Sequence, residues 1–122
     1  MKWEIAVYDE DKYIEVITSG IADGDGSLKM AKAIAQTMRA HRITKALIDH
    51  RNVESVIGST MDVYHRPKVF RLIGAILRIK IAEIIRPEHA EHFKFFETVC
   101  RNLGYQLSVF QDKDEALAWL LA

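Results

Sequence analysis

The chain of 122 residues has little that would cross-link it or insert it into a membrane. Cys100 is its one cysteine, so neither an intramolecular disulfide nor a cysteine zinc cluster can form. No uncharged run approaches the roughly 20 residues that a membrane-spanning helix needs. Apolar and polar residues alternate in residues 1–5, and acidic residues follow soon after. The amino terminus therefore lacks the apolar core of a signal peptide. We therefore expect a protein of the reduced cytoplasm.

The chain also has no excess of charge of either sign, because 17 basic side chains balance 17 acidic ones. A neutral total argues against a general nucleic-acid-binding protein, which usually has a basic domain. The charges are nevertheless unevenly spread, with −5 in residues 1–25, +8 in residues 26–86 and −3 in residues 87–122. Two interpretations remain open. The segments neutralise one another in the fold, or one positive face meets an anionic surface.

Recognisable catalytic and cofactor motifs are missing as well. The sequence contains neither a G-x-G-x-x-G loop nor a P-loop to hold nucleotide phosphates. His89 and His92 are three residues apart, which does not match the zincin pattern. Cys100 falls on the same helical stripe as Phe93 and Phe96, which favours a packed small hydrophobic residue over a nucleophile. We expect no enzymatic activity, no cofactor and no metal.

What is present is ordinary globular composition, with 49% apolar and 28% charged residues, enough for one domain over residues 1–122. Apolar side chains alternate over residues 2–8 and 12–18, which predicts a β-hairpin. Helical spacing predicts helices over residues 27–41, 59–65, 67–77, 87–103 and 116–121, and short apolar runs predict strands over 45–49, 78–85 and 105–109. This β-β-α-β-α-β-α-β-α order predicts an α/β fold with a single mixed sheet covered by helices.

Local signals mark where several helices should begin and end. Asp25 or Ser27 could cap the first helix, and Gly104 suits the residue just after the helix that starts at residue 87. Asp112, followed three residues later by glutamate, predicts the start of the last helix. Phe95 cannot share a helix face with both Phe93 and Phe96, so at least one of these aromatic rings should face away from the core.

The most unusual segment is residues 63–82, which contains no aspartate or glutamate but several basic side chains among apolar ones. Such a segment can be a cover helix with a positive outer face, a membrane-facing or ligand-covering helix, or a protein interface. For the second interpretation we expect ligand contacts from Val63, Tyr64, Val69, Phe70, Ile73, Leu77, Phe93 and Phe96. The corresponding membrane-facing residues would be Arg66, Lys68, Arg71 and Arg78.

Several segments together resemble the SpoIIAA-like branch of the STAS superfamily, small bacterial proteins related in fold to the sporulation anti-sigma-factor antagonist. The segments are the opening hairpin, the strand at residues 45–49, residues 64–70 and the ending at residues 114–120. The resemblance covers essentially the whole chain. It implies a fold that is also similar to soluble lipid carriers in which a movable helix covers an apolar pocket, and proteins that often form dimers.

The anti-sigma-factor antagonists carry an Asp-Ser-Ser-Gly turn whose second serine is phosphorylated by a partner kinase. Counting forward from Asp49 aligns that turn with residues 58–61, where Ser59 is kept and Thr60 replaces the second serine. The flanking aspartate and glycine are not kept. Ser59 and Thr60 are therefore phosphorylation candidates by resemblance, and either could equally be a helix N-cap.

Two functions follow as hypotheses. The first is a non-enzymatic module that binds an apolar ligand or associates with an anionic membrane surface, as a cytoplasmic or peripheral homodimer without nucleic-acid partners. The alternative is a STAS-type regulatory domain that docks a kinase or sensor partner.

Overall fold

The computed structural model describes residues 1–57 and 78–122. In these residues the elements are β1 (Lys2–Tyr8), β2 (Tyr13–Ala22), α1 (Gly24–His41), β3 (Lys45–Val56), β4 (Lys80–Ile84), a short 3₁₀ helix (Pro87–His89), α3 (Ala90–Asn102), β5 (Gln106–Phe110) and α4 (Lys113–Leu121). This order agrees with the predicted one wherever the chain is described. The helices predicted over residues 59–65 and 67–77 lie outside the described residues.

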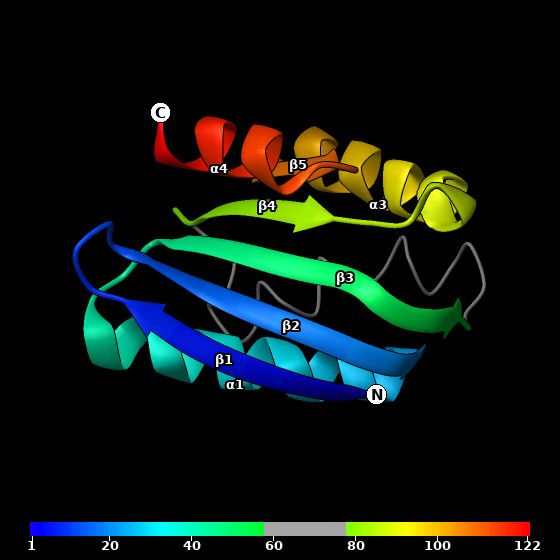
Figure 1. Ribbon diagram of the computed structural model, residues 1–122, viewed down its shortest axis with the longest axis horizontal. Helices are drawn as coiled ribbons and strands as arrows, with labels where there is room; N and C mark the ends of the chain where they lie inside the picture. The colour runs from blue at the N-terminus through cyan, green and yellow to red at the C-terminus, as the bar shows by residue number, and fades with distance from the viewer. Residues whose placement is uncertain (58–77) are drawn as a thin grey trace.

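The strands form one five-stranded sheet in which the spatial order is the chain order, β1-β2-β3-β4-β5 (Figure 1). β1 runs antiparallel to β2, and β2, β3, β4 and β5 are mutually parallel. The predicted α/β fold with a single mixed sheet is therefore confirmed. The antiparallel pair is the predicted hairpin, whose inward side chains on β1 are Trp3, Ile5 and Val7.

The two faces of the sheet carry different helices. α1 and α3 pack on one face, where Met30, Ile34 and Phe96 join strand residues such as Ile48 and Leu107 in the larger core. α4 packs on the other face, where its buried side chains meet buried residues of β2, β3 and β4. These α4-side core residues are Tyr13, Leu47, Ala82, Ile84, Ala116 and Leu120. We call the two sides the α1/α3 face and the α4 face.

Two strands are longer than the sequence pattern predicts. β2 continues through the glycine-containing segment to Ala22, and β3 continues past Asp49 to Val56. Their added ends pair with each other, with Ala22 opposite Val56, and register shifts interrupt the ladder on either side of Gly20. Gly20 has a φ of 83°, a conformation that glycine adopts without strain. Pairing between distant parts of the chain therefore extends β2 into a segment whose glycines, taken locally, predict the end of the strand.

The helix ends follow the local signals with one correction. α1 begins at Gly24, three residues earlier than predicted, because the N-cap is Asp23 and not Asp25 or Ser27. The Asp23 Oδ1 atom accepts a hydrogen bond of 2.6 Å from the backbone N–H of Gly26. At the other end of the chain the predicted cap is confirmed, since Asp112 Oδ2 accepts from the backbone N–H of Glu115 at 3.1 Å.

The helix predicted over residues 87–103 is divided in the structure. Pro87 opens a single 3₁₀ turn, and α3 proper begins at Ala90. The chain leaves α3 through Gly104, whose φ of 88° fits the predicted helix stop. Phe93 and Phe96 are buried, whereas Phe95 is 38% exposed, as the helical spacing required. Cys100 is fully buried in the larger core, as predicted for a packed small hydrophobic residue.

Candidate functional site

The described residues line an apolar pocket of about 60 Å³ between the sheet and the two helices of the α1/α3 face. α1 contributes Met30, Ala31 and Ile34, and α3 contributes Phe93 and Phe96. The further lining residues are Met1, Ala22, Ser27, Ile48, His50, Ile79, Ile81, Glu83, His92 and Leu107. A lining that is mostly apolar with a few polar groups is typical of small-molecule sites.

Two ionisable side chains of the sheet, His50 and Glu83, line this mostly apolar pocket together with His92 of α3 and Ser27 of α1. Side chains alternate along a strand, so His50 points to the same face as Ile48 two residues earlier. Glu83 of β4 is paired directly with Ile48 of β3 and therefore shares that face. His50 and Glu83 are only 5% and 4% exposed, so both lie deep beneath the helices. Register and alternation bring together these two side chains, which are 33 residues apart in the sequence.

Hydrogen bonding and stacking fix the orientation of the His50 ring. Its Nδ1 atom lies 2.7 Å from the hydroxyl oxygen of Thr18, which is fully buried on β2. Thr18 also donates to the backbone carbonyl of Asp49 at 3.1 Å. The ring of Phe93 stacks on that of His50, with centroids 5.0 Å apart, and His92 meets the edge of Phe93 at 5.1 Å. The His50 Nε2 atom then lies 3.6 Å from Glu83 Oε2.

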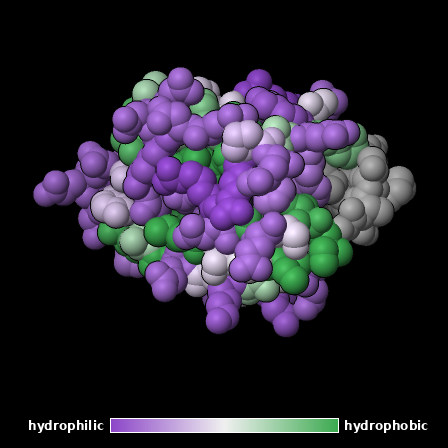
Figure 2. Space-filling view, turned by 45° about the vertical axis from the view of Figure 1, so that its right-hand side comes forward, coloured by the Kyte–Doolittle hydropathy of each residue, from purple (hydrophilic) through white to green (hydrophobic). Residues whose placement is uncertain are grey.

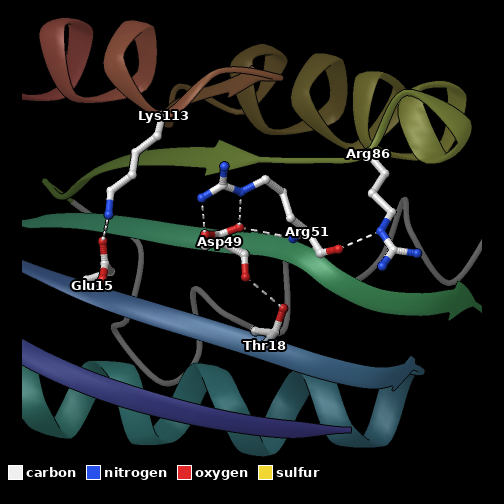
Figure 3. A network of polar contacts seen from close by, with 6 residues as sticks. All are labelled: Glu15, Thr18, Asp49, Arg51, Arg86 and Lys113. Carbon is white, nitrogen blue, oxygen red and sulfur yellow. Dashed lines mark hydrogen bonds and ion pairs between the residues drawn. The ribbon is translucent and has the colours of Figure 1, made fainter.

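The α4 face carries a second polar cluster, which Figure 3 shows together with Thr18. Arg51 donates to both carboxylate oxygens of Asp49, at 2.9 and 2.7 Å, and the nitrogen of Lys113 lies 2.9 Å from Glu15 Oε2. Arg86 donates from its Nε atom to the backbone carbonyl of Arg51. These contacts join β2, β3, the start of α4 and the segment after β4. The cluster therefore consists of two ion pairs and a hydrogen bond to the backbone.

The charge partners of this cluster shift two acid–base equilibria. Burial by itself would raise the pKa of Asp49, but hydrogen bonds from the side chain and backbone of Arg51 hold that pKa below its ordinary value of 3.8. The hydrogen bond to Glu15 raises the pKa of Lys113 above its ordinary value. Both shifts favour the charged forms, so the cluster is built to stay ionised.

Of the predicted ligand-binding residues, Phe93 and Phe96 lie in the described part, and both line the pocket. Arg78 is described too, as an exposed residue just before β4. The remaining candidates lie outside the described residues. They are Val63, Tyr64, Val69, Phe70, Ile73 and Leu77 for the ligand, Arg66, Lys68 and Arg71 for the membrane, and Ser59 and Thr60 for phosphorylation.

The sequence reasoning did not select Thr18, His50 or Glu83 as site residues. One signal was available, because Glu83 interrupts the apolar run at residues 79–85 and His50 directly follows the buried strand centre at residues 46–48. A charged residue at a buried strand position needs a partner. The identity of that partner depends on the register between β3 and β4, which a single sequence does not specify.

Two negative findings limit the chemistry of the described part. No group of three or more histidine, cysteine, aspartate or glutamate side chains there could hold a metal ion. Among the same residues no helix combines the length and apolar character needed to cross a membrane.

Comparison with known proteins gives fold relatives only. No family model and no curated protein matches the chain. Among solved structures, an anti-sigma factor antagonist from Mycobacterium paratuberculosis matches with a TM-score of 0.65 and 16% identity, over 99% of this chain and 96% of that one. An uncharacterised protein with a SpoIIAA-like fold from Shewanella loihica matches with a TM-score of 0.60 and 21% identity, over 98% and 92%.

A third solved structure, the anti-sigma factor antagonist SpoIIAA in its unphosphorylated form, matches with a TM-score of 0.53 and 12% identity. That match covers 97% of this chain and 96% of SpoIIAA. All three likenesses extend over nearly the whole chain, and they agree with the mixed sheet and the helices described above. The chain therefore has the SpoIIAA-like STAS fold.

Proposed function

We propose that this chain is a non-enzymatic regulatory domain of the STAS type, which acts by binding a protein partner of the anti-sigma factor class. The observation that carries the proposal is the end-to-end fold likeness to two anti-sigma factor antagonists. The polar cluster on the α4 face fits a structural role, since its side chains are engaged with one another.

The carboxyl ends of β2 and β3 are a reasonable place for such a partner to bind. Ile21 and Ile57 are 44% and 55% exposed there, and the chain continues from Ile57 towards Ser59 and Thr60. Figure 2 shows hydrophobic side chains gathered at this end of the molecule. Exposed large apolar side chains that are close in the sequence to Ser59 and Thr60 suit a contact that phosphorylation would switch, because a phosphate adds charge to an apolar interface.

Binding to the anti-sigma factors of the same organism, measured by calorimetry, tests this proposal. The double variant Ser59→Ala with Thr60→Ala should weaken binding to the cognate factor by about tenfold, the loss expected for a hydrogen bond to a charged group. The matched control is Thr98→Ala, because the exposed hydroxyl of Thr98, on α3, donates to the backbone carbonyl of Lys94 in the same helix. The proposal fails if none of these factors binds, or if the control loses as much affinity as the double variant.

A second candidate function is the binding of an apolar small molecule, and the pocket on the α1/α3 face favours it. Its lining is dominated by aliphatic and aromatic side chains, including Phe93 and Phe96. Ala31→Leu would narrow the pocket from α1. Ala40→Leu is the matched control, since Ala40 is an exposed residue of the same helix.

Native mass spectrometry of freshly purified protein tests this second function, and also reports the number of subunits. Co-purified ligand should be present in the wild type and the Ala40→Leu variant, and reduced in the Ala31→Leu variant. Association with a membrane is tested separately by cosedimentation with anionic vesicles, where binding should weaken with salt because ions screen surface charge. If the wild type carries no ligand and does not bind vesicles at low salt, only the regulatory proposal remains.

A further inference from the structure

The two edges of the sheet differ in how their outer backbone groups are covered. Beside β5, two side chains of α3 bond to the outer edge of the strand. The Nε atom of Arg101 donates to the backbone carbonyl of Leu107 at 3.1 Å. The backbone N–H of Val109 donates to Glu97 Oε2 at 2.6 Å. These bonds occupy backbone groups that another strand would need for pairing, so β5 is closed to strand addition.

β1, at the opposite edge of the sheet, has no such cover in the part of the chain that the structure describes (Figure 1). It pairs with β2 alone, so alternate residues direct their backbone N–H and C=O groups away from the sheet. The strand contains neither proline nor glycine, and its register with β2 is uninterrupted from Lys2 to Tyr8. β1 is therefore a regular edge of the kind that accepts another strand.

The charged side chains of β1 lie together on one face of the sheet. Trp3 and Ile5 point to the α1/α3 face, so Lys2 and Glu4, which alternate with them, point to the α4 face. Both charged side chains are exposed, and neither forms an ion pair with another described residue. β1 thus offers one positive and one negative group, two residues apart, beside its uncovered backbone.

This pair of charges is complementary to a second copy of itself. When two copies of β1 run antiparallel with Trp3 opposite the partner's Trp3, Lys2 faces the partner's Glu4. By the two-fold symmetry, Glu4 also faces the partner's Lys2. Opposite charges directly across antiparallel strands are favourable, whereas a lysine alone on an edge strand discourages pairing.

Other alignments lose this complementarity. A shift that centres the pairing on Glu4 sets Glu4 against the partner's Glu4, and like charges directly opposite are destabilising. A shift that centres it on Ile5 sets Glu4 against the partner's Ala6 and leaves both charges without a partner. The charges therefore select the alignment about Trp3.

We propose that the chain forms a homodimer through β1, in which two copies pair antiparallel about Trp3 and the two sheets become one. The two Trp3 rings then lie across from each other on the α1/α3 face, and an aromatic cross-strand pair adds to the stability of the interface. This surface goes beyond the regulatory function proposed above, because it depends on no anti-sigma factor.

Sedimentation velocity over a wide range of protein concentration tests the proposal, with the full chain carrying no amino-terminal tag. The wild type should dimerise reversibly. Glu4→Lys places lysine against lysine at two positions and should raise the dimer dissociation constant by at least about tenfold. The double variant Lys2→Glu with Glu4→Lys should restore the wild-type constant, because the two charges exchange places.

Glu10→Lys is the matched control for Glu4→Lys. Glu10 is an exposed acid in the turn of the same hairpin, so its replacement changes the net charge equally but lies outside β1. It should leave the dissociation constant unchanged. If Glu10→Lys weakens the dimer as much as Glu4→Lys does, or if the double variant fails to restore it, the proposed alignment of β1 is overturned.

Hydrogen exchange of the wild type gives a second test that needs no variant. The outward-facing amides of β1 should exchange more slowly at a concentration where the dimer is populated than at one where the monomer dominates. The proposal is overturned if the wild type stays monomeric at every concentration, or if it dimerises without added protection of β1. Added protection confined to β1 and its neighbouring residues supports it.

Discussion

The two faces of the sheet each bury one glutamate, and the two glutamates have different surroundings. On the α4 face, Glu15 contacts Lys113 at 2.9 Å, and the ammonium group reaches solvent, with 41% of the lysine side chain exposed. On the α1/α3 face, Glu83 lies 3.6 Å from a histidine that is as deeply buried as itself, inside a pocket. The ion pair of Glu15 is therefore partly solvated, whereas Glu83 shares a mostly apolar pocket with a buried histidine.

Core truncation should produce the largest difference between the two faces. Leu120→Ala on α4 removes a fully buried side chain from the tightly packed α4-side core and should lower the free energy of unfolding by about 2–5 kcal/mol. Met30→Ala on α1 enlarges a space that already exists and should fall at the low end of that range. Urea denaturation of both variants measures the difference. A larger loss for Met30→Ala would mean that the α1/α3 face is packed as tightly as the α4 face.

Neutralising each glutamate should separate the two roles. Glu15→Gln leaves Lys113 without its partner and should cost about 1–2 kcal/mol, a value reduced from that of a fully buried pair because the lysine is partly exposed. Glu83→Gln should change stability by less than about 1 kcal/mol, because it also removes a charge from an apolar pocket. Thermal and urea unfolding measure both values. Equal costs would show that the different surroundings of the two glutamates make no difference to stability.

Acid should weaken the α4 face in particular, through Asp49. Its pKa is lowered in the folded protein, so its contribution to stability is fully present above the ordinary value of 3.8 and is lost as the pH falls through the lower, folded value. The stability lost by protonating Asp49 should be smaller than that lost in the Glu15→Gln variant. Urea midpoints from about pH 6 to about pH 2 should fall less steeply for Asp49→Asn than for the wild type. If the urea midpoints of the variant and the wild type fall equally steeply with pH, Asp49 does not contribute to the loss of stability in acid.

The smallest loss of stability should follow from replacing Lys80, at the edge of the α4 face. Lys80 donates a 2.6 Å hydrogen bond to the backbone carbonyl of Trp119 and lies 4.5 Å from the centre of its ring. Lys80→Met keeps the aliphatic part of the side chain and should cost at most about 1 kcal/mol. The substitution should also change the fluorescence of Trp119. A cost as large as that of Leu120→Ala would mean that this contact anchors the whole of α4.

The sequence predicts most of the fold because the relevant signals are local. The alternation of Trp3, Ile5 and Val7 identifies the hairpin, and the capping pattern at Asp112 identifies the start of α4. The ends of β2 and β3 were missed because Ala22 and Val56 stabilise each other across strands, and no local pattern reports such pairing. The cap of α1 was missed by two residues because Asp23 and Asp25 are equally good caps in isolation.

The candidate site was predictable only in part. Helical spacing on α3 places Phe93 and Phe96 on the inward face, and the structure finds both in the pocket. The polar strand residues of the pocket, His50 and Glu83, come from two strands, and only the register between β3 and β4 determines that they meet. The prediction concentrated on residues 63–82, of which residues 78–82 are described, so the membrane interpretation of that segment stays a prediction.

The spatial order of the strands, which repeats their order along the chain, has a consequence for biosynthesis. Each strand that leaves the ribosome finds its neighbour already synthesised, and no later strand has to insert between two earlier ones. Assembly can therefore proceed from the amino-terminal hairpin outward, one strand at a time, as domains commonly begin to fold during synthesis. α4 is made after all five strands, so until it docks, the side chains that it covers, among them Leu47 and Ile84, stay open to chaperones and proteases.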